Sequence, residues 1–398
     1  MTRREFFKGS AAAVLAAYVE PWRVFGASGR GALVAPEVTT SVTLPVATSA
    51  TLPEAYSVAI LGDTHFDAEP ESFYHSRYDE TNKYAKIQHE EFRRNGEMWR
   101  ERCRSLLAAS GRLAAERPTA FALQLGDLVQ GDCDDVATHF KMLSEATLLM
   151  RGAYPAGMPF LSVLGNHDIR GKGAKAAYFG FAEPYMSEAL KDAQFSRVGE
   201  VKYPAFSFRR GDDLWVFCNF EERNLDPVSD AIDADTEARR VFLVTHGPVT
   251  AHPGGSYRWR LGGHRECDAS RPRFLKTLFS RRAIVISGHT HTTAFYRHES
   301  AEGGFTEFTV NSVWHKPELA TAEPEHSTPA EYGALPKGFD PKKADDFAAV
   351  MGMFKPTLKE YFFNNGAGHY RLNVSSDAVT MEFYPGDALS PARTFRLA

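Results

Sequence analysis

Aspartate, asparagine and histidine side chains recur along this chain directly after short apolar runs. The runs occupy residues 58–61, 121–125, 160–164, 241–244 and 283–287. The polar residues that follow them are, in the same order, Asp63 and His65; Asp127; Asn166, His167 and Asp168; His246; and His289 and His291. A glycine adjoins each set, which permits tight turns and close backbone approach to an ion. Imidazole and carboxylate together suit first-row transition metals.

The number of these groups predicts more than one ion. Asp63 and His65 are two residues apart on an extended segment, as are His289 and His291, so both members of each pair can point the same way. Two aspartates, one asparagine and four histidines exceed what one tetrahedral zinc needs. Two ions that share a carboxylate are the simplest arrangement that uses all seven. Taken singly, each aspartate could equally cap a helix, and His246 could be a core histidine.

The apolar runs must form the elements that position this cluster. Runs of four or five residues rich in Val, Ile and Leu predict strands buried on both faces. Helical patterns at 93–116, ended by Pro118, and at 136–150 lie between them. Strands that alternate with helices predict an α/β sheet, whose sites form beyond the carboxyl ends of its strands.

Composition excludes several classes of protein. The chain has 398 residues, of which 24% are charged and 43% apolar, which is an ordinary globular composition and not that of a collagen, a rod or a disordered tail. The formal net charge of −4 provides no basic field and argues against nucleic acid as a partner. Four cysteines are too few for a disulfide scaffold, and Cys218, in an apolar run, is expected in the core.

The ordered set of blocks resembles the calcineurin-like metallophosphoesterase family over residues 56–311. The blocks are Gly-Asp63-x-His65, Gly126-Asp127, Gly165-Asn166-His167-Asp168, His246 and Gly288-His289-x-His291. Purple acid phosphatases resemble this pattern but carry a tyrosine three residues after the second-block aspartate. Gln130 stands there in this chain, so a tyrosinate–iron(III) site is not expected. Mn, Fe, Zn and Ni stay open as the metals.

The resemblance implies a fold and a role for each residue. The fold would be two packed mixed β-sheets flanked by helices, an αββα sandwich. One metal would bind the set Asp63, His65 and His291, and the other the set Asn166, His246 and His289. Asp127 would bridge both metals. His167 would face the substrate as an electrophile or general acid, with Asp168 orienting its ring. The metals would generate a bridging hydroxide that attacks phosphorus in line.

The first 55 residues are predicted to lie outside the fold. Arg3-Arg4, Phe6, Lys8 and a short apolar run resemble a twin-arginine (Tat) export signal over residues 1–27. An ordinary secretory peptide or an amphipathic starter helix with a chance arginine pair is the alternative. The run is too short for a membrane span. Residues 28–55 are predicted to be a flexible lead, residues 56–398 the metallophosphoesterase domain, and the location periplasmic or secreted.

Two long segments follow ligand blocks and are expected to rim the site: residues 66–91 and 252–265. In the second, Arg258, Arg260 and Arg265 are candidates to hold a substrate phosphate, and Tyr257 and Trp259 to stack on a ring; an ordinary solvated loop is the alternative. Residues 316–355 are predicted to be an insertion or lid-like excursion, and 370–384 a hairpin that turns at 375–377.

Three functions remain in competition. The first is an exported dimetal phosphoesterase that hydrolyses a phosphomonoester or phosphodiester of a small molecule, such as a nucleotide, sugar phosphate or lipid head group. The second is a nuclease-like phosphodiesterase, which the acidic balance disfavours. The third is a non-catalytic scaffold of the same fold. Missing ligands would favour it, and none is missing from the sequence.

Overall fold

The computed structural model describes residues 55–67, 85–133, 135–199, 205–253, 257–313 and 321–398. The expected export signal, the flexible lead, residues 68–84 of the first rim segment and residues 316–320 of the expected insertion lie outside these ranges. Among the described residues, no helix is both long enough and apolar enough to cross a bilayer.

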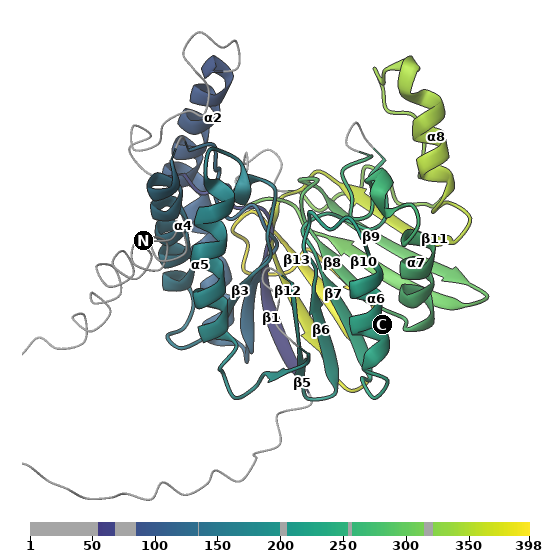
Figure 1. The fold of residues 1–398 in the computed structure, drawn as a ribbon, viewed down its shortest axis with the longest axis horizontal. Coiled ribbons are helices and arrows are strands. Elements are labelled where there is room, and N and C mark those ends of the chain that lie inside the picture. The colour runs from purple at the N-terminus through teal and green to yellow at the C-terminus, as the bar shows by residue number, and fades with distance from the viewer. Residues whose placement is uncertain (1–54, 68–84, 134, 200–204, 254–256, 314–320) are drawn as a thin grey trace, which may run out of the picture. The chain divides into compact units, whose positions relative to one another are not determined.

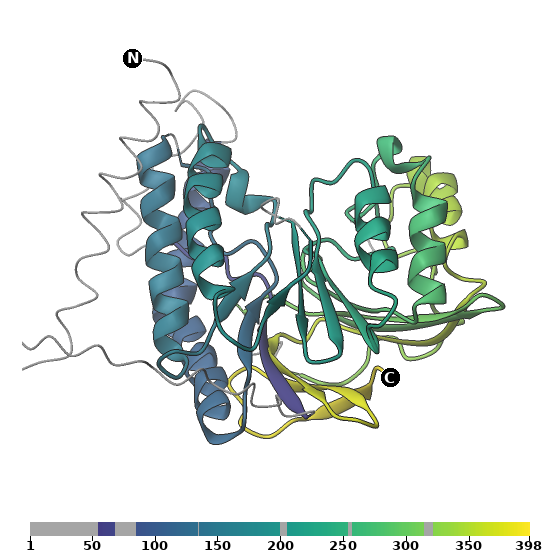
Figure 2. The ribbon, with the colours of Figure 1, turned by 60° about the horizontal axis from the view of Figure 1, so that its bottom comes forward.

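Two mixed sheets form the centre of the molecule (Figures 1 and 2). The first has the order β14-β13-β12-β1-β2-β3, in which β1, β2 and β3 are parallel and β1 pairs antiparallel with β12. Its strands are β1 (Tyr56–Leu61), β2 (Phe121–Gln124), β3 (Phe160–Ser162), β12 (Gly368–Val374), β13 (Val379–Pro385) and β14 (Arg393–Arg396).

The second sheet has the order β11-β9-β10-β8-β7-β6-β5-β4, with β6, β7, β8 and β10 parallel at its centre. Its strands are β4 (Ser196–Arg197), β5 (Phe206–Arg210), β6 (Asp213–Phe217), β7 (Arg240–Val244), β8 (Ile284–Ser287), β9 (Thr293–Ser300), β10 (Gly303–Thr309) and β11 (Leu358–Asn364). All five strands predicted to precede the ligand blocks are present as β1, β2, β3, β7 and β8.

Alternation along the strands explains the layers. In β1, Val58 and Ile60 enter the core shared by the two sheets, where they join Trp215 and Phe242 of the second sheet. The residues between them, such as Ala59, pack under the helices on the outer face. Both faces are therefore buried, as the apolar runs predicted.

Helices cover both outer faces. On the first sheet these are α2 (Ala85–Met98), α3 (Arg104–Glu116), α4 (Val136–Ala153) and α5 (Ala174–Ala189). On the second sheet they are α6 (Asp226–Ala234) and α7 (Arg271–Ser280). The predicted αββα sandwich is confirmed. The helix predicted at 93–116 begins earlier, at Ala85, and contains a π-helical turn, Trp99–Cys103, between α2 and α3.

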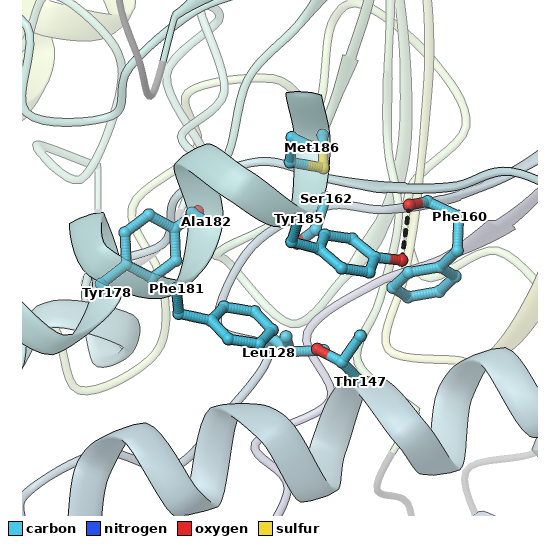
Figure 3. Close-up of a pocket in the computed structure, with 9 residues that line it drawn as sticks. All are labelled: Leu128, Thr147, Phe160, Ser162, Tyr178, Phe181, Ala182, Tyr185 and Met186. Carbon is cyan, nitrogen blue, oxygen red and sulfur yellow. Dashed lines mark hydrogen bonds between the residues drawn. The ribbon is translucent and has the colours of Figure 1, made fainter. Parts of the chain in front are cut away.

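Local contacts fix two of these helices. Asp135 caps α4 by accepting the backbone N–H groups of Ala137 and Thr138 at 2.8 and 2.9 Å. Between α4, α5 and β3, apolar side chains surround a small cavity, and the Tyr185 hydroxyl donates to the Phe160 carbonyl at 3.0 Å (Figure 3). This cavity faces the helices and takes no part in the metal-ligand cluster.

The C-terminal third completes both sheets. β12 and β13 form the predicted hairpin, with Val374 opposite Val379. Strand β10 ends at Thr309, and Cys218 is in the core as predicted. In the expected insertion, a 3-10 turn, Pro341–Lys343, leads into helix α8 (Ala344–Gly352), whose Phe347 and Met351 pack in a cluster with Tyr257 and Tyr296.

Candidate metal centre

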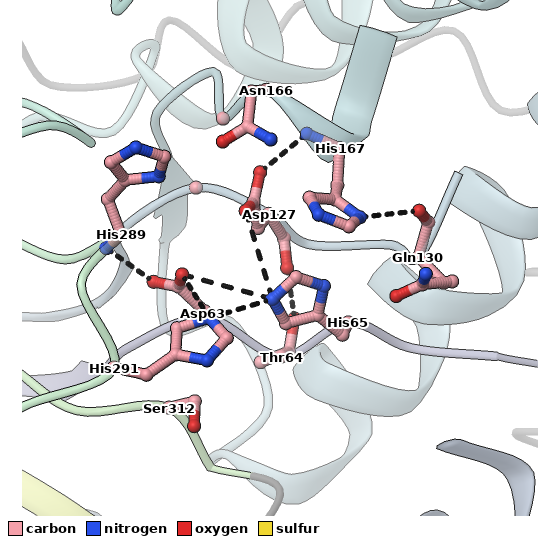
Figure 4. Close-up of polar contacts among 12 residues, drawn as sticks. Asp63, Thr64, His65, Asp127, Gln130, Asn166, His167, His289, His291 and Ser312 are labelled. Atoms are coloured by element: carbon pink, nitrogen blue, oxygen red, sulfur yellow. Dashed lines mark hydrogen bonds and ion pairs between the residues drawn. The ribbon is translucent and has the colours of Figure 1, made fainter. Parts of the chain in front are cut away.

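The predicted ligands converge from both sheets at the carboxyl ends of β1, β2, β3, β7 and β8 (Figure 4). His65 Nε2 lies 3.0 Å from His291 Nε2, and Asp63 Oδ2 lies 3.0 Å from the same His291 atom. The ligand atoms of these three residues all lie within 4.8 Å of one another. The structure thus assembles the set that the resemblance assigned to one metal.

A second group of ligand atoms forms around His246. Its Nε2 lies 3.3 Å from Asp127 Oδ2 and 3.2 Å from Asn166 Oδ1. The ligand atoms of Asp127, His246 and His289 likewise all lie within 4.8 Å of one another, as do those of His65, Asp127 and His167. Asp127 Oδ2 is in addition 3.8 Å from His65 Nε2, in the first group. Asp127 therefore lies between the two groups, in the position expected of a bridging ligand.

Glycines allow the two aspartates to be held by backbone groups. The His289 N–H donates to Asp63 Oδ1 at 3.0 Å, and the His167 N–H donates to Asp127 Oδ1 at 2.7 Å. A Cβ on Gly288 would lie 2.6 Å from Asp63 Oδ1, and one on Gly165 would lie 2.2 Å from Asp127 Oδ1. One oxygen of each carboxylate is thereby anchored, and Oδ2 is turned toward the imidazoles.

Four of the predicted ligands have left-handed backbone conformations, with φ of 41° at His65, 51° at Asp127, 71° at His289 and 51° at His291. Such conformations cost free energy in residues other than glycine and persist only where surrounding contacts hold them. At Asp127, the chain turns so that its carbonyl accepts the N–H of His65 at 2.8 Å. Four of the six described non-glycine residues with positive φ are therefore proposed ligands; the other two are Asp132 and Arg282.

These donors fit a pair of divalent cations. His246 Nδ1 lies 2.7 Å from the Leu125 carbonyl, which can only accept, so the neutral ring carries its lone pair on Nε2, facing Asp127 and Asn166. Burial, followed by the nearby His167, holds the pKa of His65 well below its usual value. Burial also lowers the pKa of His289 to about 3. At His246 burial lowers the pKa, but the charges of Asp127 and Asp63 outweigh it and raise the pKa to about 9, so a metal at Nε2 would displace a proton. Imidazoles beside carboxylates are the donor set that such metals require.

The carboxylate of Asp127 is held in its charged form. Burial alone would raise its pKa, but His246 and His167 hold that pKa well below the usual value. Asp168 behaves in the opposite way, because burial and the Asp127 charge raise its pKa to about 8.

His167 lies at the edge of the cluster, with its ring centroid 4.4 Å from that of His65. Asp168 does not orient this ring, contrary to the expectation. Asp168 instead accepts the backbone N–H groups of Val129 at 3.1 Å and Gly165 at 2.8 Å, and so ties the second ligand loop to the third. The contacts to the His167 ring are the Gln130 carbonyl, 2.8 Å from Nδ1, and Arg170 Nη1, 2.9 Å from Nε2.

Sequence reasoning missed Arg170 and Phe220. Arg170 is three residues beyond His167, a spacing that places it on the same side of the short 3-10 helix His167–Ile169. Phe220 follows the carboxyl end of β6, and its ring centroid lies 5.0 Å from that of His289. The rule that located the ligands, namely side chains just beyond strand ends, would also have found Phe220.

The rim arginines and aromatic residues separate into different roles. Tyr257 is buried and donates to Asp346 of α8, and Arg258 pairs with the same carboxylate. Arg260 is buried, whereas Arg265 is exposed and does not line the pocket beside the cluster. Trp259 is 60% exposed, and its ring centroid is 5.6 Å from that of His289. Gln130, at the tyrosine position of purple acid phosphatases, accepts from Asn95 at 2.7 Å.

Solved structures share this fold at low sequence identity. The purple acid phosphatase PPD1 from yellow lupin (Lupinus luteus) seeds is 10% identical with a TM-score of 0.51; the match covers 86% of this chain and 54% of that one. The chain thus spans about half the length of that enzyme. A dimetal phosphatase from Danio rerio (13% identity, TM-score 0.46, 87% and 99% coverage) and PhoD (11%, 0.47, 88% and 70%) also match.

No curated protein sequence matches the chain. The family model described as calcineurin-like phosphoesterase matches residues 56–293, which is more than half of the chain and includes every predicted ligand. The match agrees with the two sheets and with the groups of donor atoms at their edge. The chain therefore belongs to the calcineurin-like phosphoesterase family.

Proposed function

We propose that this enzyme hydrolyses a phosphomonoester or phosphodiester of a small molecule, such as a nucleotide, sugar phosphate or lipid head group. The observation that carries the proposal is the position of Asp127 Oδ2, 3.3 Å from His246 Nε2 in one group of donors and 3.8 Å from His65 Nε2 in the other. A carboxylate shared between two sets of imidazoles supports a dinuclear centre.

In this proposal, Asp63, His65 and His291 would hold one metal, Asn166, His246 and His289 would hold the other, and Asp127 would serve both. Transition metals such as Mn, Fe, Zn or Ni would supply Lewis acidity toward the phosphoryl oxygens and a nucleophile at neutral pH.

The chain's own residues preorganise the site. The His289 and His167 N–H groups fix the two aspartates before substrate arrives, so little reorganisation is needed during the reaction. The Gln130 carbonyl accepts from His167 Nδ1, so Nε2 is the nitrogen turned to Arg170. Since a guanidinium only donates, the group that offers N–H donors and positive charge at this corner is Arg170, with His167 orienting it.

The test is hydrolysis of a chromogenic phosphomonoester and a chromogenic phosphodiester by protein loaded with Mn, compared with a chelated control. Metal-dependent turnover is expected, and the ratio of the two rates assigns the monoester or diester class. Absence of turnover on either ester, with two metals bound per chain, would contradict the proposal and favour the scaffold.

We also propose that the chain is exported by the Tat route to the periplasm or beyond. The support is the sequence Arg3-Arg4 with Phe6 and Lys8 ahead of a short apolar run. Replacing both arginines by lysine is expected to leave the protein in the cytoplasm, as fractionation would detect. Unchanged export of that variant would rule out the route, since the charge is retained.

A further inference from the structure

A pocket of about 240 Å³ opens beside the second group of ligands. Its lining includes Asn166 and His289 from that group, the aromatic residues Phe220 and Trp259, and the basic residues Arg258 and Arg260. A substrate phosphoryl group at the cluster would therefore place its organic part next to this pocket. The residues that line the pocket therefore indicate the chemistry of that organic part.

Aromatic rings form one side of the pocket. The Phe220 and Trp259 ring centroids lie 5.0 and 5.6 Å from that of His289, at the metal-ligand cluster. Trp259 leaves 60% of its surface exposed, the largest exposed fraction among the large hydrophobic side chains of the described residues. An exposed indole beside a ligand cluster provides a flat apolar face on which a ring can stack.

Arg260 also lines this pocket. The residue is only 6% exposed. Across the described residues, its guanidinium has no hydrogen bond or ion pair, and its Nε is buried without a partner. Its one close partner is the Phe354 ring, whose centroid lies 5.5 Å from Cζ.

Burying a charge without a counter-ion is costly. Burial, together with the neighbouring cations Arg271 and Arg258, lowers the pKa of Arg260 to about 10, so it stays protonated at neutral pH. Arg258 differs, since its Nε donates to Asp346 Oδ2 at 2.6 Å. Of the two arginines in the pocket, Arg260 is therefore the one that an incoming anion would neutralise.

We propose, on the basis of the proposed function, that this pocket binds the organic part of the substrate and selects a planar ring that carries a second anionic group. Trp259 and Phe220 contact the ring, and Arg260 pairs with the second anion. The predicted substrate class is an aromatic or heteroaromatic phosphoester with an additional carboxylate or phosphate, in preference to an uncharged aliphatic phosphoester.

Equilibrium binding tests this selection without requiring turnover. The probes are phenylphosphonate, 3-carboxyphenylphosphonate and ethylphosphonate, titrated calorimetrically into the Mn-loaded protein. The expected order is 3-carboxyphenyl tightest and ethyl weakest. Arg260→Met should lower the affinity for 3-carboxyphenylphosphonate by about 10- to 100-fold and leave that for phenylphosphonate unchanged, so that the preference for the carboxylated ring is lost. Trp259→Leu should reduce the preference for phenyl over ethyl by about 2- to 10-fold.

Two further variants keep the result interpretable. Arg265→Met removes an exposed arginine that does not line the pocket and should leave all three affinities unchanged. Arg260→Lys retains the charge and should recover part of the preference, even if Arg260→Met folds poorly. Equal wild-type affinity for the carboxylated and plain rings, or a preference that survives Arg260→Met, would overturn the inference.

Turnover of phenyl phosphate, measured on the same preparations, separates the two proposals. Turnover without any binding preference would overturn the pocket assignment and leave the hydrolase proposal standing. A binding preference without turnover would support the pocket and contradict the proposed activity.

Discussion

Arg170 Nη1 lies 2.9 Å from His167 Nε2, and the same guanidinium forms an ion pair with the buried Asp132 and a longer one, 3.5 Å, with Glu91. Because a guanidinium donates only, His167 Nε2 accepts in this arrangement, and its Nδ1–H points to the Gln130 carbonyl. The imidazole is held from both sides by groups that the sequence motif does not include.

Replacing Arg170 by methionine is expected to lower kcat about 10- to 100-fold while two metals per chain are retained, because a charge-assisted contact at the reacting group is lost. Arg170→Lys should recover part of the rate. Steady-state kinetics with metal analysis measures both. An exposed arginine paired along α3, Arg112, provides the control, and Arg112→Met should leave kcat unchanged.

A double-variant cycle shows whether Arg170 and His167 act as one unit. Since His167 orients Arg170, His167→Ala alone should retain both metals and slow the reaction by about 10- to 100-fold, as Arg170→Met does. In that background, Arg170→Met should have much less effect than in the wild type, since its partner is gone. Fully multiplicative effects would mean that the two residues act independently. Loss of metal on His167→Ala would mean that His167 is itself a ligand.

Asp127→Asn is expected to reduce metal content and activity together. The substitution removes a negative charge that lies 3.8 Å from His65 Nε2 and 3.3 Å from His246 Nε2, so binding of both metals should weaken. Activity at limiting metal should fall about a hundred- to a thousandfold, the range attributed to lost electrostatic stabilisation. Metal stoichiometry measured by mass spectrometry checks the cause. Full turnover with two bound metals would refute the bridging assignment.

Asp168→Asn is expected to reduce stability more than catalysis. Both oxygens of Asp168 accept backbone N–H groups. In the asparagine variant, the amide NH₂ would replace one of these acceptors and lie against the N–H of Val129 or Gly165, so that one hydrogen bond is lost. The free energy of unfolding should fall by about 1–3 kcal/mol. Urea denaturation measures this change. Asp377→Asn, on the exposed turn of the β12–β13 hairpin, should change it by less than about 0.5 kcal/mol.

Acid should destabilise the fold through His298, which is far along β9 from the ligands. Burial lowers its pKa to about 3, and its ring contacts the hydroxyls of Thr250 at 3.1 Å and Thr357 at 3.0 Å. The unfolded chain takes up the proton near pH 6.5, whereas the folded chain does not until near pH 3. This histidine therefore destabilises the folded state progressively as pH falls through that window.

The expected change is about 1.4 kcal/mol per pH unit below 6. Urea titrations give the free energies of unfolding of wild type and His298→Gln. The amount by which the wild-type value exceeds that of the variant should shrink by about this much between pH 6 and pH 5. A pH-independent advantage for His298 would contradict its buried neutral state.

The sequence predicted the strands and the ligands because both are local signals. An apolar run followed by glycine and a ligand specifies a strand end within a few residues, and the ends of parallel neighbours such as β1, β2 and β3, or β7 and β8, lie at one edge of their sheet. The contacts of Arg170 with Asp132 and Glu91 join separate loops and a helix, so no spacing rule indicated them. Asp168 follows His167 directly, yet its side chain turns to Val129 and Gly165, which only the folded loops reveal.

The pairing of β1 with β12 has a consequence for how the protein is made. Tyr56 is opposite Val374, so the strand that carries the first ligand loop has its partner near the end of the chain. A nascent chain that stops shortly after His291 would contain all seven proposed ligands and still leave β1 with an open edge. Metal capture should therefore wait until translation is nearly complete, and truncation before Gly368 should abolish it without deleting a single ligand.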